Sequence, residues 1–502
     1  MKRVILTVLA CTLGFAHAQT LEKKKIMLHK NGMGEKMTDF IYQYAASQDE
    51  QNYYIFYRSA PAVFNGSEDI KYFVANKNLT TITKGVDLAF NKGEDYRSAF
   101  FTTNHLAVIC DNYDKKNKEM NIILKRYNKK TGAFVNNTPL AKVKTPSWNP
   151  WYYSASSPDE NMHGIVFMAE NSKEKFEEFH AFVLNNEGEV VWKVTRKLQL
   201  SNELFNLRKI AVTNDGKIYV VFSSAPNNKR SSDQMTYLDM TLVSETDNEH
   251  LSIPLDKKEL YAVNMQALNN GNLFFACVFS EDKESFPTRL QTVMFDAGKF
   301  DIISNASSEF PKMEPKTRVV MPMIGIMPSK ITYGMSISGI KELPNGEIAI
   351  VCEQSSSIVY SSSDGSRVPF YVRGDIMTAF ANKEGVVEKY DVYDRFQKGN
   401  KSKYLSCGIF TMGNQVCYLF NDHPDRFLGG KKEVTFDGNN SKDAVIACNK
   451  ISNGNPVETV FITDKTGKID KCFQNILLQD ENKLLIVTGN NSTMDLEILT
   501  IE

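Results

Sequence analysis

Two carboxylates, an amide and an imidazole stand within five residues at Asn421, Asp422, His423 and Asp425. Oxygen ligands and an imidazole this close together could bind a cation or move a proton. Pro424 lies between them, and Asx residues beside proline commonly form turns in which the side-chain oxygen accepts a hydrogen bond from a backbone amide. The turn interpretation is favoured. We keep the four residues as candidate ligand contacts and assign them neither a metal ion nor a catalytic role.

Two of the three tryptophans of the chain, Trp148 and Trp151, lie close together in the segment Trp148–Tyr153. An aromatic ring offers a flat apolar face on which a sugar or a peptide side chain can stack. We therefore predict that Trp148, Trp151 and Tyr152 contact a ligand. The alternative is that these rings fill a gap in the packed interior.

Motifs for other well-known chemistry are missing from the sequence. The histidines that follow residue 18 show no HxH or HxxxH spacing, and no GxSxG or CxxC sequence occurs. These spacings are typical of zinc sites, serine nucleophiles and redox-active dithiols. We expect no cofactor and no metal ion, and a binding protein fits the sequence better than an enzyme does.

Seven of the eight cysteines follow residue 18, and an odd number cannot all pair. Most of them lie inside apolar runs that follow a turn, so we expect buried thiols that pack as small hydrophobic side chains. Cys407 and Cys417 flank the turn at Gly413–Asn414 almost symmetrically, which leaves a cross-strand disulfide as the alternative for this pair.

The elements that must position these residues are β-strands in a repeated unit. In Ile340–Cys352, for example, Pro344–Gly346 forms a turn between two β-prone runs, which is typical of a hairpin. Such first turns recur at intervals of about 54 to 75 residues, the range of propeller-like repeats with loop insertions. They are Gln48–Gln51, Thr103–Asn104, Asp159–Asn161, Asn214–Gly216, Asn269–Gly271, Pro344–Gly346, Gly413–Asn414 and Asp480–Asn482.

A second tight turn follows seven of these first turns after a longer connection. The unit therefore contains four antiparallel strands, which is the blade of a β-propeller. The second turns are Asn76–Asn78, Lys130–Gly132, Asn186–Gly188, Thr246–Asn248, Ala297–Lys299, Lys383–Gly385 and Ser452–Gly454.

The two ends of the chain complement each other. The last unit contains only three strands, ending with Met494–Ile501, whereas Lys24–Lys30 is a surplus strand at the other end. Pairing the two would complete the last blade and remove an exposed sheet edge. We predict an all-β chain that forms one β-propeller over residues 19–502, with eight blades favoured and seven as the alternative. Two β-sandwiches would also contain many short strands but would not share this period.

The tight turns should all lie on one face of the ring because successive strands alternate in direction. The long connections then lie on the other face, which we call the long-loop face. Long loops on a rigid scaffold often carry binding residues, so we expect the site there. Ser304–Tyr333, which is rich in proline and methionine, is interpreted as a loop insertion on that face.

The first 18 residues are typical of a secretory signal: Lys2 and Arg3, then an apolar run, then Ala16–Ala18 as the cleavage site. Acylation of Cys11 is the alternative, but it leaves only about seven apolar residues before the cysteine. The chain contains 59 basic and 59 acidic side chains, so loss of Lys2 and Arg3 leaves a net charge of −2. We expect a periplasmic or secreted protein that binds no nucleic acid and has no transmembrane segment after processing.

The sequence resembles uncharacterised exported β-propellers of Gram-negative bacteria. The phrases that carry the resemblance are Val212–Val221 and Leu343–Val351, each a strand, an Asp-Gly or Asn-Gly turn and a strand, and Tyr418–Asp422. The resemblance implies the fold and export and supplies no catalytic residue. We expect a binding scaffold of the cell envelope with a protein or glycan ligand. The alternatives are a carbohydrate-active lyase or hydrolase with its site at the channel mouth, and a structural or assembly protein of the envelope.

Overall fold

The computed structural model describes most of the chain after residue 42 and two short segments before it. The described residues are 19–20, 22–23, 43–58, 70–81, 86–88, 90–145, 151–168, 178–197, 204–225, 237–254, 259–280, 287–311, 327–361, 367–399, 405–423, 425, 436–437, 445–452, 454–463, 472–480, 482–489 and 494–501. Lys24–Lys30, Trp148 and the predicted signal lie outside them.

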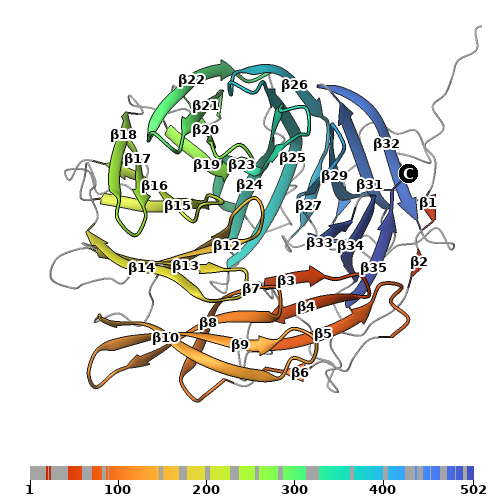
Figure 1. The fold of residues 1–502 in the computed structure, drawn as a ribbon. Coiled ribbons are helices and arrows are strands. Elements are labelled where there is room, and N and C mark those ends of the chain that lie inside the picture. The colour runs from red at the N-terminus through yellow and green to blue at the C-terminus, as the bar shows by residue number, and fades with distance from the viewer. Residues whose placement is uncertain are drawn as a thin grey trace, which may run out of the picture.

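Eight mainly antiparallel sheets follow one another around a ring, so the favoured eight-bladed β-propeller is confirmed (Figure 1). The first four blades are built as follows. Blade 1 contains β3 (Gln43–Gln48), β4 (Asn52–Arg58), β5 (Ile70–Asn76) and β6 (Val86–Asp87). Blade 2 contains β7 (Glu94–Phe101), β8 (His105–Asp114), β9 (Glu119–Asn128) and β10 (Phe134–Lys144). Blade 3 contains β11 (Trp151–Ser156), β12 (Met162–Met168), β13 (Glu178–Asn185) and β14 (Val190–Lys197). Blade 4 contains β15 (Leu204–Val212), β16 (Ile218–Ala225), β17 (Tyr237–Val243) and β18 (Asn248–Pro254).

In the second half of the ring, blades 6 and 7 contain additional strands. Blade 5 contains β19 (Glu259–Ala267), β20 (Leu273–Ser280), β21 (Arg289–Asp296) and β22 (Asp301–Glu309). Blade 6 contains β23 (Met327–Glu342), β24 (Ile348–Ser361), β25 (Arg367–Ala381), β26 (Val387–Tyr393), β27 (Gln397–Gly399) and β30 (Phe436–Asp437). Blade 7 contains β28 (Gly408–Met412), β29 (Gln415–Asp422), β31 (Val445–Ser452), β32 (Asn455–Thr463) and the parallel strand β1 (Gln19–Thr20). Blade 8 contains β33 (Cys472–Asp480), β34 (Lys483–Gly489), β35 (Met494–Thr500) and β2 (Glu22–Lys23).

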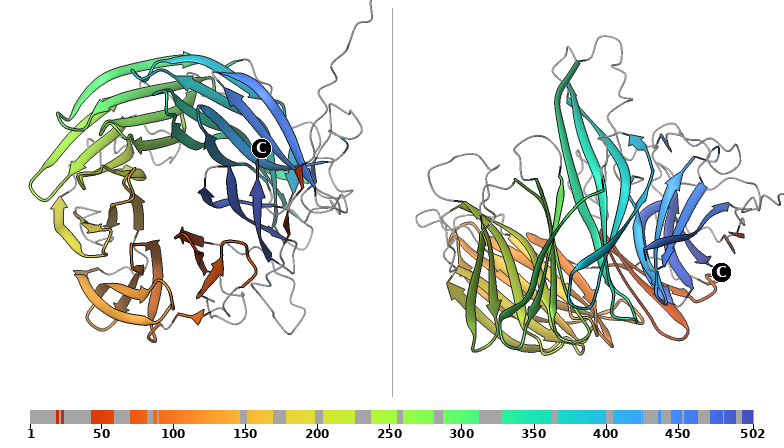
Figure 2. Two further views of the ribbon diagram at one scale, coloured as in Figure 1. Left: turned by 45° about the vertical axis from the view of Figure 1, so that its right-hand side comes forward. Right: turned by 90° about the horizontal axis from the view of Figure 1, so that it is seen from above.

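All eight predicted first turns join the first and second strands of a blade, and all seven predicted second turns join the third and fourth. On the opposite face, the connection between β8 and β9, residues 115–118, is short and lies wholly within the described residues. The prediction of a loop insertion at Ser304–Tyr333 was wrong at both ends, because Ser304–Glu309 belongs to β22 and Met327–Tyr333 to β23. Strands β23, β24 and β25 extend well beyond the ring as a long sheet, which the right-hand view of Figure 2 shows.

The predicted closing strand Lys24–Lys30 is outside the described residues. The segment just before it, β2, pairs antiparallel with β35, with Glu22 opposite Ile498 and Lys23 opposite Glu497. Side-chain packing also joins the two ends of the ring: Tyr53 of blade 1 shares an apolar cluster with Leu485 and other residues of blade 8.

The hydrophobic core is divided among the interfaces between blades. Each of eight clusters of buried apolar side chains combines residues of two neighbouring blades, and the eight clusters cover all eight interfaces of the ring. The second strands supply much of this core. In β20, for example, every residue from Leu273 to Ser280 is buried. Each blade is therefore covered on both faces by its neighbours, as an internal strand with a continuous apolar run requires.

The described cysteines pack in these cores. Cys110, Cys277, Cys352, Cys407, Cys417 and Cys448 are all buried, and none of the six forms a disulfide. The alternative of a Cys407–Cys417 disulfide was therefore wrong, and the expectation of buried thiols is confirmed for these six residues. Within the described chain, no helix has the length and hydropathy to cross a bilayer.

At the tight turns, side chains of one blade form hydrogen bonds with the backbone of the next blade. The indole Nε1 of Trp192, on the fourth strand of blade 3, donates to the carbonyl oxygen of Gly216 in the first turn of blade 4 at 3.1 Å. Gly216 has a φ of 79°, in the left-handed region that favours glycine. Trp192 is 8% exposed, so this donor lies in the interface between the blades.

Replacement of Trp192 by phenylalanine should lower the free energy of unfolding by about 1–3 kcal/mol, because the Gly216 carbonyl loses a buried donor and the smaller ring leaves a gap. Urea denaturation of the purified protein measures this difference. Val191, the preceding residue, is 48% exposed, and its replacement by alanine should change stability by less than about 0.5 kcal/mol. Equal effects of the two substitutions would contradict the proposed role of the indole.

Candidate ligand-binding channel

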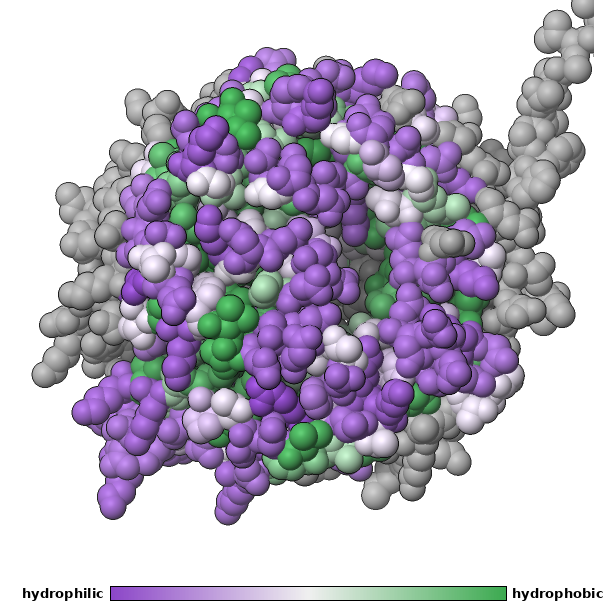
Figure 3. All heavy atoms as spheres, in the orientation of Figure 1, coloured by the Kyte–Doolittle hydropathy of each residue, from purple (hydrophilic) through white to green (hydrophobic). Residues whose placement is uncertain are grey.

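The first strands of the blades surround a central channel. Strands β3, β7, β11, β15, β19, β23, β28 and β33 each contact the next one around the ring. Two adjacent cavities of about 650 and 440 Å³ lie along this channel and share Lys341, Ile409 and Ile476 in their walls. Figure 3 shows the corresponding hollow near the centre of the ring. All eight first strands contribute to one cavity or the other, so the channel is a property of the closed ring.

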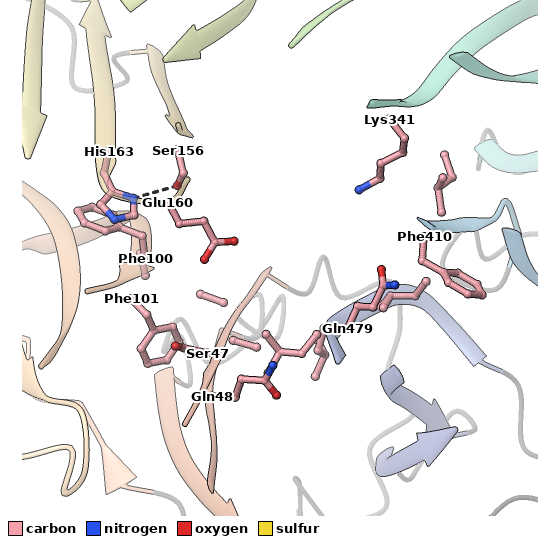
Figure 4. Close-up of a pocket in the computed structure, with 17 residues that line it drawn as sticks. Ser47, Gln48, Phe100, Phe101, Ser156, Glu160, His163, Lys341, Phe410 and Gln479 are labelled. Carbon is pink, nitrogen blue, oxygen red and sulfur yellow. Dashed lines mark hydrogen bonds between the residues drawn. The ribbon is translucent and has the colours of Figure 1, made fainter. Parts of the chain in front are cut away.

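The larger cavity, which we call the turn-side cavity, lies where the first strands reach their tight turns. Gln48 is the last residue of β3, and Glu160 belongs to the turn between β11 and β12. Glu160 and Lys341 extend from opposite walls toward the open space (Figure 4). The predicted site was on the other, long-loop face. Most connections of that face lie outside the described residues, so that placement stays a prediction.

His163 is a buried imidazole in the wall of the turn-side cavity. Its Nδ1 lies 2.9 Å from the hydroxyl oxygen of Ser156, and its ring stacks on Phe100 with centroids 4.3 Å apart (Figure 4). Its Nε2 is buried and has no partner among the described residues. Burial lowers the pKa of His163 to about 4, so the ring is neutral at neutral pH. A neutral, tightly packed ring is suited to shaping the wall of the cavity.

The smaller cavity, which we call the lysine-side cavity, contains two lysines. Lys209 of β15 and Lys341 of β23 both line it, together with Asn264, Gln266 and Ser338. Partial desolvation in the channel lowers the pKa of both lysines, of which Lys341 is half-buried and Lys209 is exposed. Among the described residues, neither ammonium group has an acidic partner within ion-pair distance. The cavity therefore combines uncompensated positive charge with amide and hydroxyl groups.

A buried charged network lies directly behind this cavity. Glu353, 1% exposed, accepts hydrogen bonds from the guanidinium of Arg395 and from the hydroxyl of Ser406, and the Nε of Arg373 lies 3.7 Å from its Oε2. Arg395 is completely buried, and Glu353 is the main cause that raises its pKa against the effect of burial. Ser406 precedes Cys407, which lines the lysine-side cavity. The network thus joins blade 6 to the segment that leads into the first strand of blade 7, and it fixes this part of the wall.

The structure brings two of the predicted site residues to this network. Asn421 and Asp422 end β29 and are both completely buried, and the carbonyl oxygen of Asn421 accepts a hydrogen bond from Gln397 Nε2 at 2.6 Å. Asp422 contributes to the raised pKa of Arg395, which places its carboxylate near that guanidinium. In this structure both side chains are surrounded by protein.

His423 and Asp425 lie just beyond the end of β29 and are half-buried. The backbone amide of Asp425 donates to His423 Nδ1 at 3.1 Å, and that nitrogen lies 3.9 Å from a carboxylate oxygen of Asp425. These are contacts within one turn, as the turn interpretation predicted. Their role toward a ligand stays a prediction.

The aromatic candidates lie in two blade interfaces. Trp151 packs against the cluster shared by blades 3 and 4. Tyr152 packs with the cluster of blades 2 and 3, and its hydroxyl donates to Asp111 Oδ2 at 2.9 Å. Burial and the nearby Asp111 raise the pKa of Tyr152 well above its usual value. Both rings have the packing role that the sequence offered as the alternative to ligand contact. Trp148 lies outside the described residues.

Acidic and metal-binding side chains are sparse among the described residues of the two cavities. Within the described part of the chain, no three His, Cys, Asp or Glu side chains are grouped so that they could hold a metal ion. Glu160 is the one carboxylate among the described residues that line the two cavities. The described residues of these two cavities therefore include no pair of acids of the kind that glycoside hydrolysis uses.

The sequence did not indicate Lys209, Lys341, Glu353 or Arg395. A basic residue in a strand is usually a solvated side chain, and no motif marks these four positions. The position of the two lysines in the repeat could have indicated them. Lys209 and Lys341 lie on strands that end in a predicted first turn. Such strands are the first of each blade and line the channel of a propeller.

Comparisons with known proteins add the following. No protein-family model and no curated protein matches this sequence. Among similar solved structures, a protein of unknown function from Bacteroides caccae has a TM-score of 0.28 and 12% identity, over 68% of this chain and 94% of that one. Saccharomyces cerevisiae Sqt1 has a TM-score of 0.43 and 10% identity, over 94% and 100%. The polysaccharide lyase Uly1 has a TM-score of 0.39 and 10% identity, over 84% and 94%.

These likenesses are weak and concern the fold alone. The assignment of a β-propeller therefore depends on the eight sheets of this chain, and function has to be inferred from its own residues.

Proposed function

We propose that the protein is an exported binding scaffold of the cell envelope that takes up its ligand in the central channel. The observation that supports this most directly is the pair of adjacent cavities lined by all eight first strands. Concave sites of several hundred cubic ångströms with a few convergent polar groups are typical of ligand binding. The signal-like residues 1–18 support export.

Binding is favoured over catalysis by the composition of the channel wall. Its described residues include two lysines, one carboxylate and several amides and hydroxyls, and its one histidine is neutral and packed in the wall. Groups of this kind can hold a polar ligand. A general acid and base pair, or a nucleophile beside an activating base and an oxyanion site, is what an enzyme would need in addition.

The test is a binding screen with a variant that blocks the channel. Protein lacking residues 1–18 is applied to arrays of envelope glycans and envelope proteins, and the ligands it retains are measured again with Ser338→Trp. Ser338 is exposed in the wall of the lysine-side cavity, so an indole there fills part of the space. The matched control is Ser307→Trp on β22, an exposed residue of an outer strand.

We expect Ser338→Trp to abolish retention and Ser307→Trp to leave it unchanged, with both variants folded by circular dichroism. Retention that survives Ser338→Trp but is lost in a Trp148→Ala, Trp151→Ala double variant would move the site to the predicted aromatic segment and contradict the channel. Failure of the array to retain any ligand would contradict a binding role in the envelope.

A further inference from the structure

We propose that Lys209 and Lys341 form an anion subsite in the channel that takes the acidic groups of an oligosaccharide, that is, carboxylates or sulfates carried on sugar units. This inference depends on the proposed binding function and names the class of ligand.

The positive charge of the lysine-side cavity has no described counter-charge. Lys209 and Lys341 come from blades 4 and 6, on either side of the β19 segment Asn264–Gln266, and the three strands line one cavity of about 440 Å³. No carboxylate is among the described residues that line this cavity. Lys341 is half-buried in the wall and Lys209 is exposed, so both side chains can be reached by a ligand in the cavity. An anion in the cavity would supply the missing counter-charge to both ammonium groups.

Two arginines at equivalent positions in blades 2 and 4 differ in their partners. Their comparison indicates that the excess of positive charge belongs to the blade 4 side of the channel. Each of Arg97 in β7 and Arg208 in β15 occupies a bulge at the same place in the first strand of its blade. Arg97 is neutralised by Asp111, with Nε at 2.7 Å from a carboxylate oxygen. Arg208 instead donates to the hydroxyl of Ser223 at 2.6 Å, and its pKa is lowered by burial. Blade 4 therefore has two basic residues, Arg208 and Lys209, at the place where blade 2 has the Arg97–Asp111 ion pair, whose net charge is zero.

The other groups of the wall favour a sugar over an acidic peptide. Gln266 and Ser338 line the cavity beside the lysines, and Asn264 adds a further side-chain amide. Amides and hydroxyls both donate and accept hydrogen bonds, and so do the hydroxyl groups of a sugar ring. Of the apolar residues in the described wall, Met265, Ile340 and Cys407 are buried, which leaves Ile409 and Ile476 as its partly exposed apolar side chains. This is little apolar surface for anchoring a peptide side chain.

The experiment is isothermal titration calorimetry of the whole processed protein with defined probes. The probes are tetragalacturonate, a chondroitin sulfate tetrasaccharide, neutral cellotetraose and a hexaglutamate peptide. We expect at least one of the acidic oligosaccharides to bind and cellotetraose to bind at least about tenfold more weakly. Binding should weaken as salt is raised, since an ion pair in the channel is screened by added ions.

Substitutions assign the binding to the two lysines. Lys209→Met and Lys341→Met keep most of the side-chain length and remove the charge, so each should weaken binding of the acidic oligosaccharide about tenfold and the double variant more. The control is Lys193→Met, an exposed lysine on the outer strand β14, which should have no effect. Unchanged affinity in the double variant would overturn the subsite.

The remaining outcomes also discriminate. Tighter binding of hexaglutamate than of either acidic sugar would overturn the assignment to oligosaccharides. Failure of both acidic sugars to bind would do the same. A neutral array ligand whose retention is lost in Ser338→Trp would keep the channel as the binding site while removing the anion subsite, so the failure of this inference is distinguishable from failure of the proposed function.

Discussion

Replacement of Glu353 by glutamine is expected to lower the free energy of unfolding by about 3–5 kcal/mol, which is the usual cost of removing one partner of a buried ion pair. Glu353 is the acceptor for Arg395 and Ser406 and lies 3.7 Å from Arg373. An amide in its place would leave the buried guanidinium of Arg395 and the partly buried one of Arg373 without this carboxylate. Urea denaturation at neutral pH measures the loss.

The matched control for this prediction is Glu309→Gln. Glu309 also pairs with an arginine, Arg289, at 3.1 Å, but its side chain is 78% exposed. Pairs exposed to solvent contribute little, so this substitution should change stability by less than about 1 kcal/mol. If Glu353→Gln cost no more than the control, the network would be held by hydrogen bonds that an amide can also make, and the charge would be irrelevant.

Acid should destabilise the protein through His163. The pKa of this residue is about 4 in the folded chain and 6.5 for an ordinary histidine. Below pH 6.5 the unfolded chain therefore binds a proton that the folded chain does not, and stability is lost as the pH falls from 6.5 toward 4. With about 1.36 kcal/mol for each pKa unit, the loss from this residue approaches about 3 kcal/mol.

The measurement compares unfolding free energies at pH 7, 5.5 and 4.5 for the wild type, His163→Asn and His163→Phe. Asparagine can keep a hydrogen bond to Ser156, and phenylalanine can keep the stacking on Phe100. Neither titrates, so both variants should lose less stability than the wild type between pH 7 and pH 4.5, whatever their stability at pH 7. A wild-type slope equal to that of both variants would show that His163 does not carry the acid sensitivity.

The repeat could be predicted because the turns are local. A turn such as Asn345-Gly346 needs a residue with positive φ, and Gly346 has a φ of 84°. The composition of such turns is visible in the sequence, and the positions of the turns then give the strands, their antiparallel direction and the number of blades. The extension of β23–β25 beyond the ring was missed because its strands continue the β-pattern of the blade without a turn that marks where the ring ends.

The site could not be predicted in the same way because its partners are far apart in the chain. Glu353 and Arg395 are 42 residues apart, and Lys209 and Lys341 come from different blades. Bulges add a second difficulty. The pairing of β23 with β24 shifts between Ile337 and Gly339, so the alternation of inward and outward residues breaks at Ser338. If strict alternation is assumed along the whole strand, the residues that follow the bulge are assigned to the wrong face of the sheet.

The apolar clusters between blades have a consequence for how the chain tolerates change. Solenoid repeats need a polar cap at each end, whereas every blade here has a neighbour on both sides, Tyr53 of blade 1 and Leu485 of blade 8 included. Excision of any one blade would expose the apolar faces of both of its neighbours at once. A change in a connection between strands leaves these apolar clusters intact, whereas the loss of a blade does not.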